Sequence, residues 1–189
     1  MNSEIINQLE KSVNENNFLK EPRVYNLGGN LVAKFGTKRS IENEYKFGKF
    51  LYGKKLNIPK IYGKIDRDEI KAGLSLSKPY EVAIITEKIK GKNLYDFLET
   101  EKDEALRKKA IANSKEQIKK VLREGINLMD ANLMNLIIDE TGEAYIIDFE
   151  CHNKEMKKDY LIDFYKRFIQ SIDYHDKKFY KDEKGGNIK

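Results

Sequence analysis

Residues 127–150 read NLMDANLMNLIIDETGEAYIIDFE, and this stretch constrains the fold more than any other part of the chain. Two apolar runs flank a turn signal at residues 140–142, which predicts a β-hairpin. A hairpin of this length brings its ends together, so we expect Asn135 and Asp148 to face each other across the ladder. Asp130 lies in the loop just before the first strand. Two carboxylates and an amide oxygen would then form a hard, oxygen-rich site that suits Mg²⁺.

The same residues also fit a purely structural role. Asp130 and Asn132 are typical of loops that form Asx turns, and Asp148 would then only end a strand. The five-residue spacing from Asp130 to Asn135 is frequent by chance. The hairpin that ends in two apolar residues, Asp and Phe is the more specific pattern.

A second constraint is the lysine inside the apolar run LVAKF. The ammonium group of Lys34 must reach water or find a partner, because burying it unpaired costs several kcal/mol. Glu42 and Glu44 lie on the predicted helix that follows. Glu44 shares a face with the apolar positions of that helix, which favours it as the partner. The alternatives are a solvent-facing lysine on an edge strand and glutamates that are plain surface residues.

The remaining pattern predicts a mixed α+β chain that divides near residues 90–93. We expect a first lobe at residues 1–90 and a second at 91–189. The expected helices cover residues 3–13, 38–55, 93–98, a long segment capped by Thr100 that reaches about Arg123, and 157–170. The expected strands are a hairpin at 23–36 with its turn at Gly28–Asn30, then 60–65 and 80–89. In the helix at 38–55, the predicted buried face is Ile41, Tyr45, Gly48, Leu51 and Tyr52.

Composition narrows the classes of protein. The 189 residues carry a net charge of +5 and a sequence pI near 9.0, which suits an anionic ligand such as a nucleotide and also RNA or a membrane surface. One cysteine excludes an internal disulfide, and two histidines give no zinc cluster. No apolar run approaches the roughly 20 residues of a membrane span, and no signal peptide is visible. We therefore expect a soluble, cytoplasmic protein.

Together these motifs resemble the protein-kinase-like superfamily over residues 22–171. LMDANLMN resembles the catalytic loop, IIDFE the metal-binding motif, and LVAKF the strand that carries the phosphate-binding lysine. VAIITEKIKG resembles the strand and hinge between the lobes. The resemblance implies a two-lobed protein-kinase-like α+β fold with a minimal, mainly helical second lobe. The chain resembles most the small atypical members: RIO kinases, the KEOPS-associated kinase, lipopolysaccharide-core kinases and aminoglycoside- and choline-type phosphotransferases.

The resemblance also implies roles for individual residues. Asp130 would be the catalytic base, and Asn135 and Asp148 would hold Mg²⁺ or Mn²⁺. Lys34, paired with Glu44, would contact the phosphates of ATP.

Two further positions complete the implied nucleotide site. Glu87 and Ile89 would offer backbone groups to the adenine edge. Asp163, on the helix after the metal motif, would brace the catalytic loop, or would simply lie on the polar face of that helix.

The chain departs from the family pattern at three places. It has no G-x-G-x-x-G, only Gly28 and Gly29 before the lysine strand, so the first strand of the usual five is expected to be missing. Leu128 stands at the usual His position, and D-F-E replaces D-F-G. The resemblance implies an ATP- and Mg-dependent phosphotransferase that acts on a hydroxyl of a protein or a small molecule. One alternative is a pseudokinase that binds a nucleotide without turnover and acts as a regulator or partner in a protein complex. The other is an RNA-associated basic domain.

Overall fold

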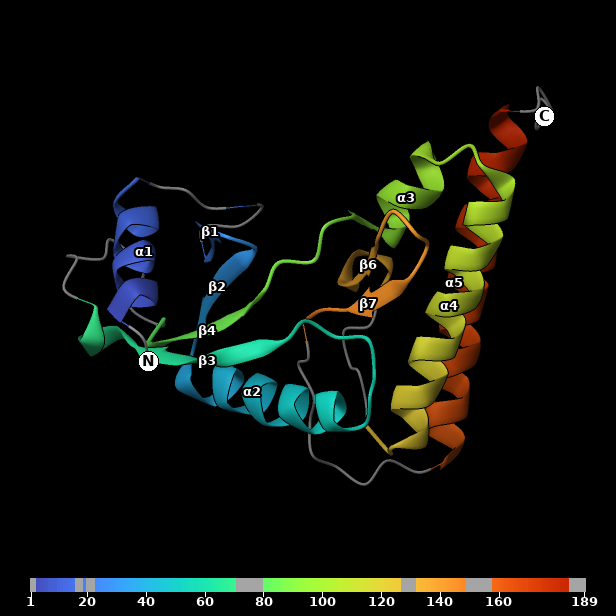
Figure 1. Cartoon of the computed structure of the whole chain (residues 1–189). Coiled ribbons are helices and arrows are strands. Elements are labelled where there is room, and N and C mark those ends of the chain that lie inside the picture. The colour runs from blue at the N-terminus through green and yellow to red at the C-terminus, as the bar shows by residue number, and fades with distance from the viewer. Residues whose placement is uncertain are drawn as a thin grey trace. The chain divides into compact units, whose positions relative to one another are not determined.

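The computed structural model describes residues 3–15, 19, 23–70, 80–126, 132–148 and 158–183 (Figure 1). It is a mixed α and β structure, as the sequence predicted. Residue contacts divide it into two compact units. Unit 1 comprises Met1–Lys54 and Pro59–Lys88, and unit 2 comprises Lys55–Ile58 and Ile89–Lys189.

Unit 1 is built on a four-stranded antiparallel sheet in the order β1-β2-β4-β3. The predicted hairpin forms β1 (Val24–Gly28) and β2 (Leu31–Gly36), with β3 (Ile61–Asp66) and β4 (Val82–Glu87) beside it. At the turn, Gly28, Gly29 and Asn30 have φ angles of 81°, 53° and 65°. This left-handed backbone is the one that glycine and asparagine tolerate best. A fifth strand does not occur among the residues of unit 1 that the structure describes.

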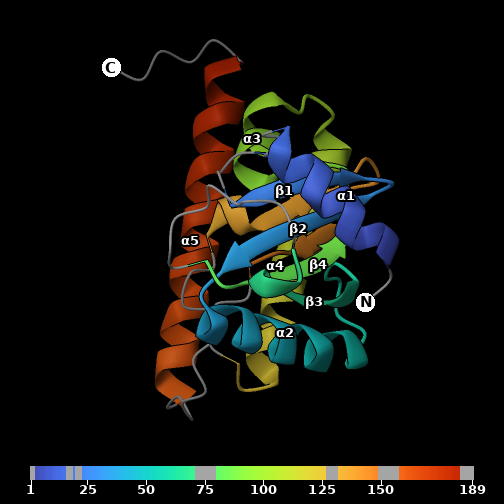
Figure 2. The ribbon, with the colours of Figure 1, turned by 90° about the vertical axis from the view of Figure 1, so that its left-hand side faces the viewer.

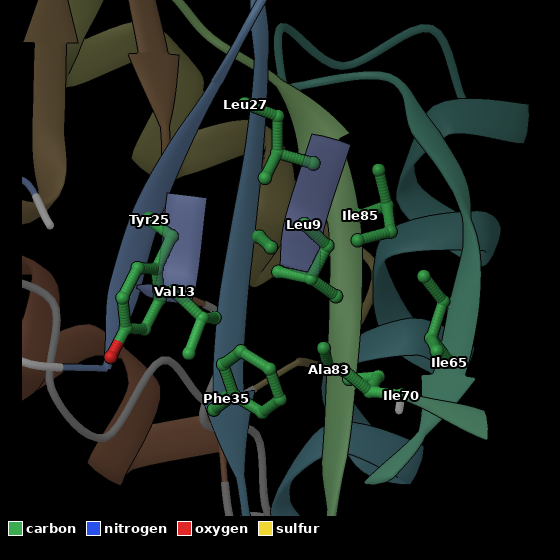
Figure 3. Close-up of a cluster of buried hydrophobic side chains, with 10 residues drawn as sticks. Leu9, Val13, Tyr25, Leu27, Phe35, Ile65, Ile70, Ala83 and Ile85 are labelled. Atoms are coloured by element: carbon green, nitrogen blue, oxygen red, sulfur yellow. The ribbon is translucent and has the colours of Figure 1, made fainter. Parts of the chain in front are cut away.

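One face of this sheet is covered by α1 (Ser3–Asn14), as Figure 2 shows. The helix is amphipathic, and its Leu9 and Val13 pack into a cluster of apolar side chains from all four strands (Figure 3). The strand residues of this cluster alternate along the sheet, because successive side chains point to opposite faces. They are Tyr25, Leu27, Ala33, Phe35, Ile65, Ala83 and Ile85, joined by Ile70 beyond β3.

The opposite face carries α2 (Lys38–Gly53), which begins where the Thr37 hydroxyl accepts a hydrogen bond from the Ser40 amide at 3.2 Å. A second apolar cluster joins Ile41 of this helix to Ile61, Val82 and Ile84. Tyr52 was expected on the buried face, but 52% of it is exposed. Adjacent helical residues point about 100° apart, so with Leu51 buried its neighbour faces water.

Unit 2 contains a small antiparallel sheet of β5 (Lys92–Asn93), β6 (Leu136–Ile138) and β7 (Ala144–Ile146). Its helices are α3 (Leu94–Thr100), α4 (Glu104–Arg123) and α5 (Lys158–Glu183), and a 3₁₀ turn, η2 (Leu133–Asn135), precedes β6. Another 3₁₀ turn, η1 (Arg67–Glu69), follows β3 in unit 1. No helix in the described ranges is long and apolar enough to cross a membrane.

Hydrogen bonds attach the short segment Lys55–Ile58 to unit 2. The Asn57 carbonyl accepts from the Ile146 amide at 3.0 Å, and the Asn57 amide donates to the Gln117 side chain at 3.3 Å. Gly91 lies directly against the backbone of β6. A Cβ at Gly91 would lie 2.1 Å from the carbonyl oxygen of Ile138, so no side chain fits there.

Two predictions about the helices of unit 2 were wrong. Thr100 does not cap the long helix: it ends α3, and the Asp103 carboxylate caps α4 by accepting from the amides of Ala105 and Leu106. The last helix was expected to end near residue 170 but continues to Glu183. Its second half is joined to α4 by two ion pairs, which the apolar pattern alone does not reveal.

One of these ion pairs involves a buried arginine of α4, and the other is partly exposed. Arg107 is only 4% exposed. It donates to the carbonyl groups of Leu98 and Glu101, and to the Asp176 carboxylate at 2.8 Å. Lys115 contacts Asp173 at 2.7 Å. Arg107 therefore joins the end of α3, the start of α4 and the second half of α5.

Aromatic rings complete the contact between α3 and α5. Tyr95 meets His175 edge-on at a ring distance of 5.2 Å, and Phe179 lies 5.9 Å from the imidazole ring. Burial, and secondarily the charge of Lys178, lowers the pKa of His175. The neutral imidazole is thus the form that this packing favours.

Candidate functional site

Lys34 lies on the α2 side of the sheet in unit 1. Its neighbours Ala33 and Phe35 pack toward α1, so alternation along β2 turns Lys34 to the opposite face. There its Nζ donates to Oε2 of Glu44 at 3.0 Å. The two side chains are only 13% and 7% exposed, so both charges are largely removed from water.

The structure distinguishes between the two glutamates of α2. Glu44 lies on the buried face of the helix, whereas Glu42 pairs with Lys64 at the exposed edge. A buried ion pair gains little net stability, because desolvation of both charges offsets their attraction. The Lys34–Glu44 pair is therefore poorly explained by folding energy alone, and a partly enclosed charged pair is typical of a functional site.

Glu87 and Ile89 stand at and just beyond the end of β4. The amide of Glu87 donates to the Lys60 carbonyl at 2.8 Å, and its carboxylate accepts from the Lys60 amide at 3.2 Å. The Glu87 amide is therefore already hydrogen-bonded to the residue that precedes β3. Ile89 is half-buried in the irregular segment between β4 and β5. Their role toward adenine stays a prediction.

In unit 2, local hydrogen bonds position Asn135. The Asn132 side chain caps η2 by accepting from the Met134 amide at 2.8 Å, and the Asn135 amide donates to the Asn132 carbonyl at 3.1 Å. The predicted hairpin then follows in β6 and β7. Asp130, the expected catalytic base, lies outside the residues that the structure describes.

The register of this hairpin differs by one residue from the prediction. Ile138 pairs with Ala144, and the Ile147 amide donates to the Asn135 carbonyl at 2.9 Å, so Ile147 and not Asp148 is opposite Asn135. In a continued strand, Asp148 would point to the opposite face from Asn135. Asp148 instead has a φ angle of 61°, which ends the extended backbone.

Asn135 and Asp148 nevertheless line one small hollow. Asn132 and four apolar residues complete its lining: Ile118, Leu136, Ile146 and Ile147. Its volume of about 10 Å³ is close to the minimum for a single water molecule. Asp148 shares its left-handed backbone with Asn30 and Lys55, and Asp is among the residues that adopt this conformation most readily.

The chemistry of these side chains fits a Mg²⁺ ion that also binds substrate phosphates better than a metal centre made of protein ligands alone. No group of three or more His, Cys, Asp or Glu side chains that could hold a metal occurs within the described ranges. Asn135 and Asp148 supply one amide oxygen and one carboxylate. Mg²⁺ commonly uses one or two carboxylates and takes its other ligands from water and substrate phosphates.

The turn of the hairpin is held by Asp139. One of its carboxylate oxygens accepts from the Thr141 amide, the Thr141 hydroxyl and the Glu143 amide at 2.8–2.9 Å. Burial raises the pKa of Asp139, but these hydrogen bonds outweigh burial and leave the pKa below its usual value. The turn thus fixes β6 and β7, and Asn135 and Asp148 lie just outside these strands.

The structure decides the roles of two further residues. Of the two alternatives for Asp163, the polar face of α5 is confirmed, because its side chain is 69% exposed and lies 4.0 Å from Lys166. Asn132 forms the expected Asx turn, since its side chain accepts from the Met134 amide two residues later. The sequence did not indicate that Asn132 also lines the hollow with Asn135 and Asp148.

The chain has a kinase-like fold, as the sequence motifs predicted. No family model matches the chain, and no curated protein matches it in sequence. Among solved structures, the chain is similar to the bifunctional kinase-methyltransferase WbdD, with 18% sequence identity and a TM-score of 0.56. The match covers 79% of this chain and 34% of that one.

A second crystal structure of WbdD, at 2.2 Å resolution, gives the same identity and TM-score over 76% of this chain and 33% of that one. The chain therefore spans about a third of the length of the WbdD chains. At this level of identity, the likeness shows the fold alone, and the particular kinase family stays a prediction.

Proposed function

We propose that the protein is an ATP- and Mg²⁺-dependent phosphotransferase that transfers the γ-phosphoryl group to a hydroxyl of a protein or a small molecule. The observation that carries this proposal is the enclosed Lys34–Glu44 pair within a kinase-like fold. A lysine held by a carboxylate keeps its charge in one place, where it can meet phosphate oxygens without reorganisation.

Each residue has a distinct role in this proposal. Lys34 contacts the α- and β-phosphates, and Glu44 orients it. Asn135 and Asp148 hold the metal ion, which when bound neutralises charge on the transferred phosphoryl group. Asp130 orients the acceptor hydroxyl and accepts its proton. Most of the rate then comes from positioning and electrostatics.

The backbone groups of Glu87 and Ile89 complete the proposal by holding the adenine edge. The carbonyl of Glu87 is the group proposed for this contact, because its amide already donates to Lys60.

A second function is favoured by one specific observation. The described part of unit 1 has four strands, and the sequence has no G-x-G-x-x-G motif. A protein without a glycine-rich cover over the phosphates can bind a nucleotide and still fail to transfer its phosphoryl group. A regulatory nucleotide-binding module is therefore the alternative.

Thermal unfolding with and without Mg-ATP tests the proposal. A ligand at 100 times its Kd stabilises by about 2.7 kcal/mol, which raises the Tm of a protein of this size by about 5–10 °C. Asp148→Ala should lose that rise, whereas Asp163→Ala, an exposed aspartate on α5, should keep it. No rise with Mg-ATP or Mn-ATP at 5 mM would refute both functions.

Turnover separates the two functions. If the wild type binds nucleotide, prolonged incubation with labelled ATP should release ADP or label the protein. Binding without either product contradicts phosphotransfer and supports the regulatory module. Asp130→Asn should abolish turnover with little effect on the Tm rise, because its proposed role concerns the acceptor hydroxyl.

A further inference from the structure

Residues 45–64 carry positive charge with no acidic residue among them. This segment contains six lysines and no Asp or Glu, so it is more positive than the whole chain with its net charge of +5. The other basic helix, α4, also carries many cations, but several of them pair with carboxylates, as in Glu104–Lys108 and Lys115–Asp173. A solvated surface needs no such segregation of charge. The absence of acidic residues here therefore calls for a separate explanation.

The lysines of α2 lie on its solvent side together with aromatic rings. The sheet-facing side of the helix is buried through Ile41, Glu44, Phe47, Gly48 and Leu51. The helical period places Tyr45 and Lys49 on the flank toward β3, and Lys46 and Phe50 on the neighbouring exposed stripe. Phe50 is 44% exposed, and Lys54 Nζ lies 5.4 Å from its ring centre.

Strand β3 extends this surface at the edge of the sheet. A bulge between Ile61 and Gly63 leaves Tyr62 outside the ladder and 46% exposed. Lys60 Nζ lies 5.0 Å from the Tyr62 ring centre. Helix and strand are in direct contact, because Lys49 Nζ donates to the Ile61 carbonyl at 3.4 Å.

We propose that this lysine–aromatic surface, formed by Tyr45, Lys46, Lys49, Phe50, Lys60 and Tyr62, binds single-stranded nucleic acid. The exposed rings of Phe50 and Tyr62 and the half-buried ring of Tyr45 all lie beside lysines, which matches the two needs of such a ligand. Bases stack on aromatic faces, and the phosphates between them meet ammonium groups. The Lys–ring contacts keep each cation beside a stacking platform rather than remote from it.

Local carboxylates reduce the charge of this surface only at its borders. Among the six lysines of residues 45–64, Lys64 has a carboxylate partner in Glu42, and the Glu87 carboxylate accepts from the backbone of Lys60. The surface therefore keeps a net positive charge that complements a phosphate backbone.

An anionic membrane fits this surface less well. A helix bound to a bilayer inserts its apolar face, but the apolar face of α2 is already packed against the sheet. The rings that face water are one phenylalanine and several tyrosines, which offer little area for insertion. Stacking against a base needs only one exposed ring face, and a lysine over the other face adds a cation for the phosphates, so the surface fits nucleic acid better.

Fluorescence anisotropy with labelled 20-nucleotide oligo(U) and oligo(dT) tests the proposal, at 50, 100 and 200 mM salt. We expect binding that weakens steeply with salt. Phe50→Ala and Tyr62→Ala should each weaken binding about 5- to 150-fold, which corresponds to the cost of about 1–3 kcal/mol per lost stacking contact. Lys46→Gln with Lys60→Gln should lower the slope of log K against log salt by about 1.4, or about 0.7 for each lost phosphate contact.

The matched control removes the same charge elsewhere. Lys108 and Lys119 lie on α4 in exposed ion pairs. The double variant Lys108→Gln/Lys119→Gln should leave the affinity for the oligonucleotides and its salt slope nearly unchanged. Equal losses in this control would overturn the assignment to α2 and β3. So would the absence of binding at 50 mM salt with 50 μM protein, or equal affinity for a duplex of the same length.

A vesicle assay excludes the other occupant. Phosphatidylserine-containing vesicles should bind more weakly than oligo(U), and Tyr62→Leu should reduce only nucleic-acid binding, since leucine keeps apolar area but offers no ring. Tighter vesicle binding that survives Tyr62→Leu would overturn the proposal. None of these measurements involves ATP, so their outcome is independent of the proposed phosphotransfer.

Discussion

The Lys34–Glu44 pair allows a prediction with opposite signs for single and double substitutions. Glu44→Leu leaves the largely buried ammonium of Lys34 without this carboxylate, and Lys34→Met does the converse. Removing one partner of a buried pair costs about 3–5 kcal/mol. Replacing both by apolar side chains removes the desolvation cost as well. The double variant Lys34→Met/Glu44→Leu should therefore lie within about 1–2 kcal/mol of the wild type, or exceed it.

Urea unfolding followed by far-UV circular dichroism measures this cycle, because the chain has no tryptophan to report by fluorescence. With a slope of about 1–3 kcal/mol per M urea, each single variant should lower the midpoint by at least about 1 M. Glu42→Leu is the matched control on the same helix. It breaks the exposed pair with Lys64 and should cost no more than about 1 kcal/mol.

Two results would refute this reasoning. If Glu44→Leu costs no more than Glu42→Leu, the pair is not desolvated as described. If the double variant is destabilised by the sum of the single effects, the two side chains are not coupled. A stable double variant that has lost the Mg-ATP shift would instead separate the role of the pair in binding from its role in folding.

Three further predictions concern unit 2. Arg107→Met should cost about 2–4 kcal/mol in urea unfolding because it leaves buried carbonyl groups without their donor, whereas Lys108→Met, in an exposed pair, should cost less than about 0.5 kcal/mol. Gly91→Ala should lower the Tm by forcing β5 from β6, while Gly53→Ala, with open space around it, should be neutral or slightly stabilising. The folded state lowers the pKa of His175, so the contribution of this residue to stability is complete above about pH 6.5 and is lost as pH falls through the folded pKa. His175→Phe should therefore flatten that part of the stability curve between pH 7.5 and 5. An unchanged curve contradicts this assignment.

The sequence predicted the elements whose side chains alternate clearly between apolar and polar. The hairpin before Lys34, the helix carrying Glu44 and the strands on either side of the turn at Asp139 were all expected from such patterns. Local turn chemistry supported them, since glycine, asparagine and aspartate each have a known preference at these turns. Glu44 was preferred over Glu42 by the same periodicity, and the structure pairs it with Lys34.

Other features depend on tertiary contacts that no local pattern encodes. Arg107 is polar, so nothing in its neighbourhood marked it as buried, and its contact with Asp176 joins α4 to the part of α5 beyond residue 170. The register at Asn135 depends on how many residues the turn of the hairpin uses, and a difference of one residue exchanges the faces of a strand. The left-handed backbone of Asp148 likewise cannot be inferred from residue type alone.

The docking of α1 on the sheet has a consequence for synthesis on the ribosome. Leu9 and Val13 pack beside Ala83 and Ile85, which the ribosome adds roughly 75 residues later. At about 5–20 residues per second, the apolar side of this first helix waits about 4–15 s for the strand that completes its binding surface. During synthesis of unit 1, the apolar side of α1 is therefore exposed for several seconds. Slower translation of the intervening segment would prolong the time in which chaperones and neighbouring chains can bind this apolar side.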